Sequence, residues 1–257
     1  MKLLDKNTGI IIQARSLSTR LPNKLFLPFY NNNGIINILI EGFLNCVDPQ
    51  SKIILATSDN QADDVFIDIA GKYGIELFRG DEQDVLNRFV QAASFYKIDN
   101  IVRVCADNPI YDYCGTIELL KSYLAMDSDY TAYELKGGIP SIKSHLGFWG
   151  EVVSLRALKK IQERTNEKVF IEHVTNYIYT HPDNFVINFI KTSPKFYSRK
   201  DVRLTVDTIE DFEMVKKIYA ALKFNNESIR IDDVIDFIDT NAYYLEIMKK
   251  QILENSK

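Results

Sequence analysis

Short apolar runs alternate with segments of helical pattern through roughly the first 125 residues. The apolar runs have no polar alternation, which is typical of strands buried on both faces of a parallel sheet. The segments between them repeat apolar residues at helical spacing, so the alternation predicts βαβ units. The predicted strands are Gly9–Ile12, Lys52–Thr57, Ile75–Phe78 and Ile101–Cys105, and the predicted helices are Ile35–Cys46, Ala62–Tyr73, which Gly74 would end, and Asp84–Tyr96.

The rhythm changes in the second half of the chain. Asp129–Phe148 contains two adjacent glycines and a proline, and this predicts a hairpin or an excursion from the sheet. We expect one α/β domain over residues 1–257, with an insertion at 130–200 and a helical tail at 226–257. Further helices are predicted at Glu151–Glu163, Phe170–Thr180, Ile209–Leu222 and Ser228–Ile252, and strands at Phe185–Lys191 and Val202–Val206.

Composition narrows the function classes only slightly. The 257 residues are 46% hydrophobic and 26% charged, with a net charge of -4, and no basic stripe suggests nucleic acid as a partner. No segment approaches the ~20 apolar residues of a membrane span, and the first residues do not resemble a signal peptide. The three cysteines have no zinc-like spacing. We therefore expect a cytoplasmic protein that binds neither nucleic acid nor membrane.

The loop after the first predicted strand, Gln13–Lys24, is rich in cations. Ligands of open α/β sheets bind outside the carboxyl ends of the strands, which is where this loop lies. Arg15, Arg20 and Lys24 fall within ten residues and are interleaved with serine and threonine. Guanidinium groups suit the oxygens of a polyphosphate. The alternative is a solvated basic loop, and the position after a buried strand favours phosphate binding.

Two aspartates follow predicted strands and are candidates for a magnesium site. Asp107 follows the predicted strand Ile101–Cys105, and Asp207 follows the predicted strand Val202–Val206. Mg²⁺ commonly takes one or two carboxylates as ligands, together with phosphate and water. The alternatives are a helix cap for Asp207 and a turn for Asp107. His173 alone is more typical of a structural residue. No GxGxxG, GxxxxGK[ST] or GxSxG motif occurs, which speaks against a dinucleotide fold, a P-loop enzyme and a serine hydrolase.

Several short segments occur in a fixed order between residues 13 and 208. They are Gln13-Ala14-Arg15, Ser18-Thr19-Arg20-Leu21-Pro22 with Lys24, Ala56-Thr57-Ser58-Asp59-Asn60, Phe78-Arg79-Gly80, Asp84-Val85-Leu86-Asn87-Arg88, Val102-Arg103 with Asp107 and Pro109, Glu172-His173-Val174-Thr175, and Arg203-Leu204-Thr205-Val206-Asp207-Thr208. Together they resemble the cytidylyltransferases that make activated acidic sugars, including the CMP-sialate and CMP-octulosonate synthetases. The resemblance is greatest to the branch named after spore-coat polysaccharide biosynthesis protein F.

The resemblance implies a three-layer α/β/α sandwich with a mostly parallel sheet, and a homodimer formed through the insertion. It implies transfer of CMP from CTP to a sugar or sugar-phosphate-like acceptor, with release of pyrophosphate, for polysaccharide or glycan precursor synthesis. The implied roles are Lys24, Arg15, Asp107 and Asp207 in catalysis; Ala14, Arg15, Ser18, Arg20, Lys24, Ser58, Arg79 and Arg88 in nucleotide binding; Asp107 and Asp207 as ligands of Mg²⁺; and Glu172 and His173 at the acceptor pocket or dimer interface.

The chain departs from the family pattern at two positions. Leu17 stands where the phosphate loop usually has glycine, and Ala106 stands where glycine usually precedes the metal aspartate. Glycine lets a backbone approach a phosphate closely, so Leu17 is the larger departure.

Three other functions stay open at this point. One is a guanylyl- or uridylyltransferase of the same fold. A second is a glycosyltransferase that consumes a nucleotide sugar, although such enzymes usually show Asp-x-Asp where this chain has Asp107-Asn108-Pro109. A third is a non-catalytic relative that binds nucleotide.

Overall fold

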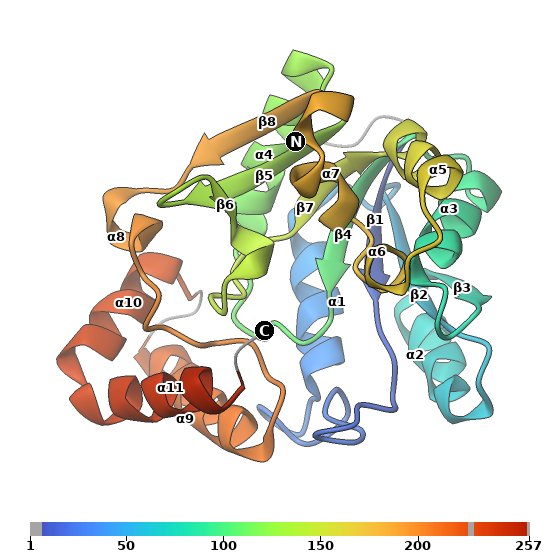
Figure 1. Ribbon diagram of the computed structural model, residues 1–257. Coiled ribbons are helices and arrows are strands. Elements are labelled where there is room, and N and C mark those ends of the chain that lie inside the picture. The colour runs from blue at the N-terminus through green and yellow to red at the C-terminus, as the bar shows by residue number, and fades with distance from the viewer. Residues whose placement is uncertain (1–6, 226–228, 256–257) are drawn as a thin grey trace.

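The computed structural model describes residues 7–225 and 229–255. Its centre is a mixed sheet of eight strands in the order β3-β2-β1-β4-β7-β5-β6, with β8 paired to β5 (Figure 1). The pairs among β1 to β4 are parallel, and β7 is antiparallel to both β4 and β5. The strands are β1 (Thr8–Gln13), β2 (Lys52–Ser58), β3 (Glu76–Gly80), β4 (Asn100–Cys105), β5 (Tyr130–Leu135), β6 (Ile139–Pro140), β7 (Glu151–Ser154) and β8 (Ile187–Lys191).

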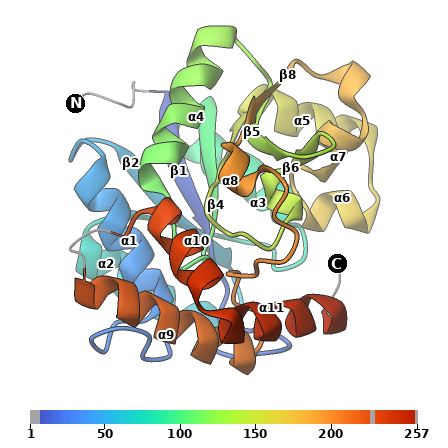
Figure 2. The same cartoon turned by 90° about the vertical axis from the view of Figure 1, so that its left-hand side faces the viewer.

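Helices cover both faces of the sheet, which confirms the predicted three-layer α/β/α sandwich. Along β1, Ile10 and Ile12 enter one core together with α1, α2, α4 and α9, while Ile11 enters the other with α3 and α5 (Figure 2). The helices are α1 (Ile35–Cys46), α2 (Val65–Tyr73), α3 (Val85–Phe95), α4 (Tyr113–Met126), α5 (Leu155–Arg164), α6 (Lys168–Glu172), α7 (Asn176–Thr180), α8 (Pro194–Tyr197), α9 (Ile209–Asn225), α10 (Ile231–Thr240) and α11 (Ala242–Glu254).

Local sequence signals account for the boundaries of several elements. Gly74 ends α2 in the left-handed conformation, with φ of 63°, as predicted. The Asp84 side chain accepts a hydrogen bond from the backbone N–H of Asn87 and caps α3. Gly137 and Gly138 have positive φ and form the turn between β5 and β6, which confirms the hairpin. The segment is not an excursion from the sheet, because β5 is itself a strand of the main sheet.

The prediction of a helix over Glu151–Glu163 was wrong in its first four residues. Glu151–Ser154 forms β7, whose two central valines are fully buried in the sheet. The Ser154 side chain accepts a hydrogen bond from the N–H of Ala157, so the helix begins only after it. The helix predicted over Phe170–Thr180 is also divided, into α6 and α7.

The strand predicted at Val202–Val206 is absent, although the segment is buried. Its N–H groups do not pair with a neighbouring strand. Leu204 donates to the carbonyl of His145, at 2.8 Å, and Val206 donates to the carbonyl of Asp107, at 3.0 Å. The apolar pattern of Val202–Val206 correctly indicated a buried segment, but it could not show which groups accept the hydrogen bonds of its backbone.

Helix α9 corresponds to the helix predicted at Ile209–Leu222. The helix predicted at Ser228–Ile252 in the tail is divided at Asn241 into α10 and α11. Residues 226–228 and 256–257 of the predicted tail lie outside the described residues. None of the described helices is long and apolar enough to cross a membrane.

Candidate active site

A pocket of about 270 Å³ lies at the carboxyl ends of β1 and β4. All of the predicted site residues line it except Ser58 and Arg79. It adjoins a wider cavity of about 730 Å³, and Arg15 and Glu172 border both. We call the smaller pocket, which holds most of the cations, the phosphate cleft; the charged residues of the wider cavity beside it are mainly carboxylates. The residues of the predicted set that line the phosphate cleft are Ala14, Arg15, Ser18, Arg20, Lys24, Arg88, Asp107, Glu172, His173 and Asp207.

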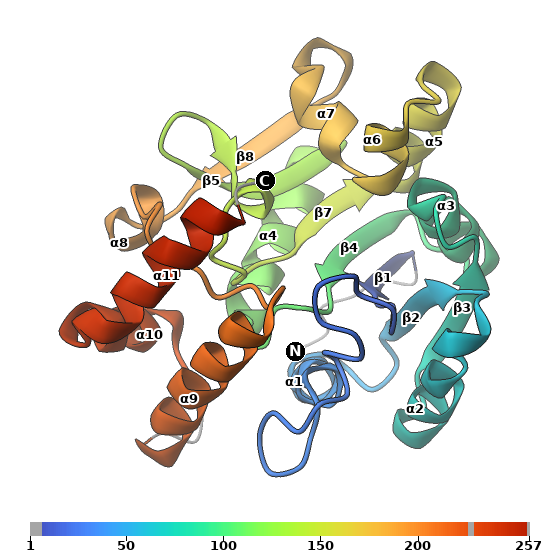
Figure 3. The ribbon, with the colours of Figure 1, turned by 60° about the horizontal axis from the view of Figure 1, so that its bottom comes forward.

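Lys24 joins the two predicted metal-binding aspartates. Its Nζ lies 3.1 Å from Oδ2 of Asp107 and 3.6 Å from Oδ1 of Asp207, and donates a 2.6 Å hydrogen bond to the carbonyl of Val206. Three segments far apart in the sequence thus meet at one ammonium group. Figure 3 shows the loop after β1 beside the end of β4 and the start of α9.

The backbone around Asp207 is held by a buried ion cluster. The fully buried Arg203 donates from Nε and Nη2 to Asp211, at 2.8 and 2.7 Å, and from Nη2 to Asp207, at 3.1 Å. Burial alone would lower the pKa of the Arg203 guanidinium, but Asp211 and Asp207 raise it above its usual value. Arg203 therefore stays charged and orients the Asp207 carboxylate.

Thr208, rather than Asp207, caps helix α9. The Thr208 hydroxyl accepts from the N–H of Asp211, at 3.2 Å, and the Asp211 carboxylate accepts from the N–H of Thr208, at 3.1 Å. This reciprocal pair is a capping box. The helix cap therefore lies at Thr208, one residue after the predicted position at Asp207. The Asp207 carboxylate does not cap the helix, and it pairs with Arg20 in the cleft at 2.9 Å.

The phosphate loop after β1 is fixed by a carboxylate that the sequence analysis did not single out. Asp63 is buried and accepts hydrogen bonds from the N–H and hydroxyl of Ser16, from the hydroxyl of Thr57, and from the N–H and hydroxyl of Ser58. Burial alone would raise the pKa of Asp63, but these hydrogen bonds outweigh it and hold the pKa below its usual value. Because Ser16 is 47 residues away from Asp63 in the sequence, no local pattern predicts that Asp63 fixes the loop.

Leu17 fits the loop without a strained backbone. It is not among the described residues with positive φ, so its position does not demand the left-handed freedom of glycine. The residue is 47% exposed. The leucine is thus compatible with the loop conformation.

Ser58 and Arg79 lie outside the cleft. The Ser58 hydroxyl is buried against Asp63. Arg79 donates to the carbonyls of Ser58 and Asn60, at 3.1 and 2.9 Å, and pairs with Asp64 at 2.8 Å. Both residues organise the loop after β2.

Arg88 and Arg103 add buried positive charge to the cleft wall. Arg88 donates to the carbonyl of Asp81 at 2.8 Å, and burial lowers the pKa of its guanidinium. Arg103, which had no predicted role, pairs with the buried Glu151 at 2.6 Å. An arginine inside the apolar run of β4 could have indicated a functional or paired residue, because a buried cation requires a partner.

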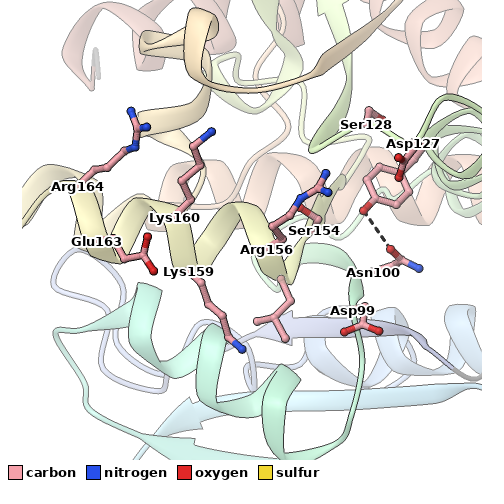
Figure 4. Close-up of a pocket in the computed structure, with 12 residues that line it drawn as sticks. Asp99, Asn100, Asp127, Ser128, Ser154, Arg156, Lys159, Lys160, Glu163 and Arg164 are labelled. Carbon is pink, nitrogen blue, oxygen red and sulfur yellow. Dashed lines mark hydrogen bonds between the residues drawn. The ribbon is translucent and has the colours of Figure 1, made fainter.

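A second cavity of about 730 Å³ lies at the opposite end of the sheet (Figure 4). It borders Asn100, where β4 begins, and Ser154, where the antiparallel β7 ends. Its cations, Arg156, Lys159, Lys160 and Arg164, all come from α5. None of the predicted site residues reaches it, so it is separate from the phosphate cleft.

Comparison with known proteins gives matches along almost the whole chain. Residues 9–247 match a family model described as cytidylyltransferase. An uncharacterised protein of Methanocaldococcus jannaschii is 36% identical over 236 residues, which are 90% of each chain. The spore coat polysaccharide biosynthesis protein SpsF of Bacillus subtilis is 34% identical over 213 residues, 81% of this chain and 85% of that protein. The structure of a cytidylyltransferase from Leptospira borgpetersenii superposes with a TM-score of 0.81 at 28% identity, covering 93% of this chain and 96% of the other.

Proposed function

This chain belongs to the cytidylyltransferase family, and we propose that it transfers CMP from CTP to a sugar-like acceptor with release of pyrophosphate. The observation that carries the proposal is the convergence on Lys24 of two carboxylates, Asp107 and Asp207, at the mouth of a cation-lined cleft. Membership of the family and the 34% identity to a spore coat polysaccharide biosynthesis protein support the choice of CTP and of a sugar acceptor.

The cleft has the charges needed to hold a triphosphate. Arg15, Arg20 and Lys24 enter it from the loop after β1, and Arg88 and Arg103 enter it from α3 and β4. Positioned cations of this kind neutralise the charge that builds on a departing pyrophosphate. Since phosphoryl transfer asks little covalent chemistry of a protein, positioning and charge neutralisation are the main tasks of these residues.

The residues at the mouth of the cleft fit a divalent cation such as Mg²⁺. Asp107 and Asp207 offer oxygen ligands from two segments and already share one cationic partner, the Lys24 ammonium. The described residues contain no group of three or more His, Cys, Asp and Glu side chains suited to a metal, so phosphate and water oxygens would complete the coordination. A bound Mg²⁺ would act as a Lewis acid on the α-phosphate.

The reaction forms a bond between an acceptor oxygen and the α-phosphorus, breaks the bond from that phosphorus to the β-phosphate oxygen, and releases the proton of a hydroxyl acceptor to solvent. Lys24 and Arg15 would offset the charge on the leaving pyrophosphate. Glu172 and His173, at the end of α6, line the cleft and would border the acceptor. The predicted homodimer through residues 130–200 stays a prediction.

Titration calorimetry with each of the four ribonucleoside triphosphates, with and without Mg²⁺, tests the proposal. We expect CTP to bind most tightly and to require Mg²⁺. Tighter binding of GTP or UTP would keep the reaction class and change the base. Absence of binding by all four would contradict the proposal. Release of pyrophosphate in the presence of a sugar acceptor then separates a transferase from a protein that only binds nucleotide.

A further inference from the structure

A small cavity of about 80 Å³ lies next to the phosphate cleft. Cys105 and Asp107 border both, so the cavity opens beside one of the proposed metal ligands. Its remaining wall comes from the segment after Asp107, from residues 141–149 and from Thr205. The volume suits a group of a few heavy atoms, because one water-sized probe occupies roughly 10–15 Å³.

Polar atoms that lack a hydrogen-bond partner gather in this cavity. In the described part of the chain, six buried side-chain atoms have no partner, and three of them belong to residues that line it. They are Oδ1 of Asn108, Oγ of Ser141 and Oγ1 of Thr205, on side chains that are more than nine-tenths buried. Since unsatisfied buried polar groups are costly, such a cluster indicates a group that binds there.

Gly147 keeps the cavity open. Its φ of 66° is one that side chains rarely adopt, and a Cβ there would lie 2.9 Å from Oδ1 of Asn108 and 3.1 Å from Cγ2 of Thr205. Any larger residue would therefore press on two of the three unpartnered side chains. The chain thus leaves room for a ligand at the place where its polar atoms point.

The cavity favours an uncharged ligand. Among the described residues that line it there is no Lys, Arg or His, and the only carboxylate is Asp107. The Trp149 indole N–H is committed to Asp112, at 2.9 Å, so Phe148 and Trp149 offer apolar walls. Asn108 Oδ1 accepts a hydrogen bond, and the two hydroxyls both donate and accept, which matches the hydroxyl groups of a polyol.

We propose that this cavity is the subsite for an uncharged, hydroxyl-bearing end of the acceptor, the end remote from the reacting oxygen. The inference rests on the proposed function, because Asp107 links the cavity to the transfer site. It makes the acceptor a sugar or polyol whose remote end bears neither carboxylate nor phosphate, since no Lys, Arg or His lines the cavity in the described part of the chain to neutralise either group.

Ligand-observed NMR on the full chain loaded with CTP and Mg²⁺ tests this without requiring turnover. The probes are glycerol, erythritol and sorbitol, each beside its carboxylate counterpart: glycerate, erythronate and gluconate. We expect at least one polyol to bind, about tenfold more tightly than its carboxylate partner. Equal or tighter binding of the carboxylates, or no binding of any polyol, would overturn the subsite.

Two substitutions localise the binding. Thr205→Val and Ser141→Ala remove unpartnered hydroxyls with little change in shape, and each should weaken polyol binding about threefold to tenfold. Ser51→Ala is the matched control, because Ser51 Oγ is also buried and unpartnered but lies outside the cavity. Unchanged polyol affinity in both cavity variants would overturn the proposal. Thermal unfolding of each variant checks that it folds.

The same samples separate this inference from the proposed function. If the protein binds CTP and releases pyrophosphate while the cavity variants leave polyol affinity unchanged, the subsite is wrong and the transferase stands. If no nucleoside triphosphate binds, the proposed function fails, whatever the polyols show. A structure determined with the bound polyol would place its hydroxyls against Asn108 and Thr205, and a cavity holding only water under those conditions would refute the assignment.

Discussion

The two ends of the sheet carry similar charges in different arrangements. At the carboxyl end, cations from the β1 loop, α3 and β4 meet carboxylates from two further segments, and Lys24 is nearly buried among them. At the opposite end, four cations lie along one helix, α5, and its Lys159 is exposed (Figure 4). The opposite cavity, of about 730 Å³, is larger than the pocket of about 270 Å³ that holds Lys24 and as large as the wider cavity beside that pocket. Convergence of charges from distant segments, rather than volume or the number of charges, is therefore what distinguishes the proposed site from the opposite end.

The largest expected contrast is in turnover. Lys24→Ala should lower the rate of pyrophosphate release by about 100- to 1000-fold, because it removes a fixed cation from the proposed transfer site. Lys159→Ala, the matched change at the opposite end, should leave the rate within about twofold. Steady-state assays of both variants at saturating CTP measure the contrast. A similar loss in both would erase the distinction between the two ends.

A second contrast concerns stability. Arg203→Met should lower the free energy of unfolding by about 3–5 kcal/mol, because the buried Asp211 would lose its countercharge. The comparable pair at the opposite end is Arg156 with Asp129, where the arginine side chain is 67% exposed. Arg156→Ala should cost about 0–1 kcal/mol. Urea unfolding of the three proteins gives both values, and equal losses would contradict the buried ion cluster as an anchor for Asp207.

A smaller loss of stability is expected when Asp63, the carboxylate that fixes the phosphate loop, is replaced. Asp63→Asn keeps the volume but replaces one accepting oxygen by a donor, so either the donors of Ser16 on Oδ1 or those of Thr57 and Ser58 on Oδ2 lose their partner. We expect a loss of about 1–3 kcal/mol in the free energy of unfolding, together with weaker CTP binding. Asp63→Glu is the control that keeps the charge. Normal CTP binding in the asparagine variant would show that the loop does not depend on Asp63.

The smallest effect is a pH dependence shared by both ends. The folded-state pKa of Asp63 is lowered, and so is that of Asp129, where hydrogen bonds from Val186 and Arg156 outweigh the effect of burial. A lowered pKa contributes stability above the unfolded value of about 3.9, and that stability is lost as pH falls through the folded value. The deficit of Asp63→Asn should therefore shrink when unfolding is repeated between about pH 6 and pH 3. A constant deficit would mean that the Asp63 charge contributes nothing.

Patterns that arise from a single segment predicted their elements well. The buried strands β1, β2 and β4 and the helix α1 follow directly from apolar runs and helical spacing, because each run is buried along its own length. Glu151–Ser154 and Val202–Val206 were assigned wrongly for the opposite reason. Whether a buried segment becomes helix, strand or irregular chain there depends on which distant backbone accepts its hydrogen bonds.

The residues of the candidate site also fall into those that the sequence could place and those that only the tertiary structure could place. The position of Arg15, Arg20 and Lys24 after a buried strand, and the ordered family segments, placed most of the cleft from the sequence. Only the tertiary structure brought Asp107 and Asp207 to one ammonium group, moved the helix cap to Thr208, and directed Ser58 and Arg79 away from the cleft.

The sequence by itself determined the fold class, the family and the chemical character of the phosphate cleft, because these depend on residue types at short, ordered spacings. The tertiary structure alone decided the role of Asp63 and formed the small cavity lined by Asn108, Ser141 and Thr205. The physical reason is that hydrogen-bond partners and cavity walls are supplied by segments tens of residues apart, and their pairing exists only once the chain has packed.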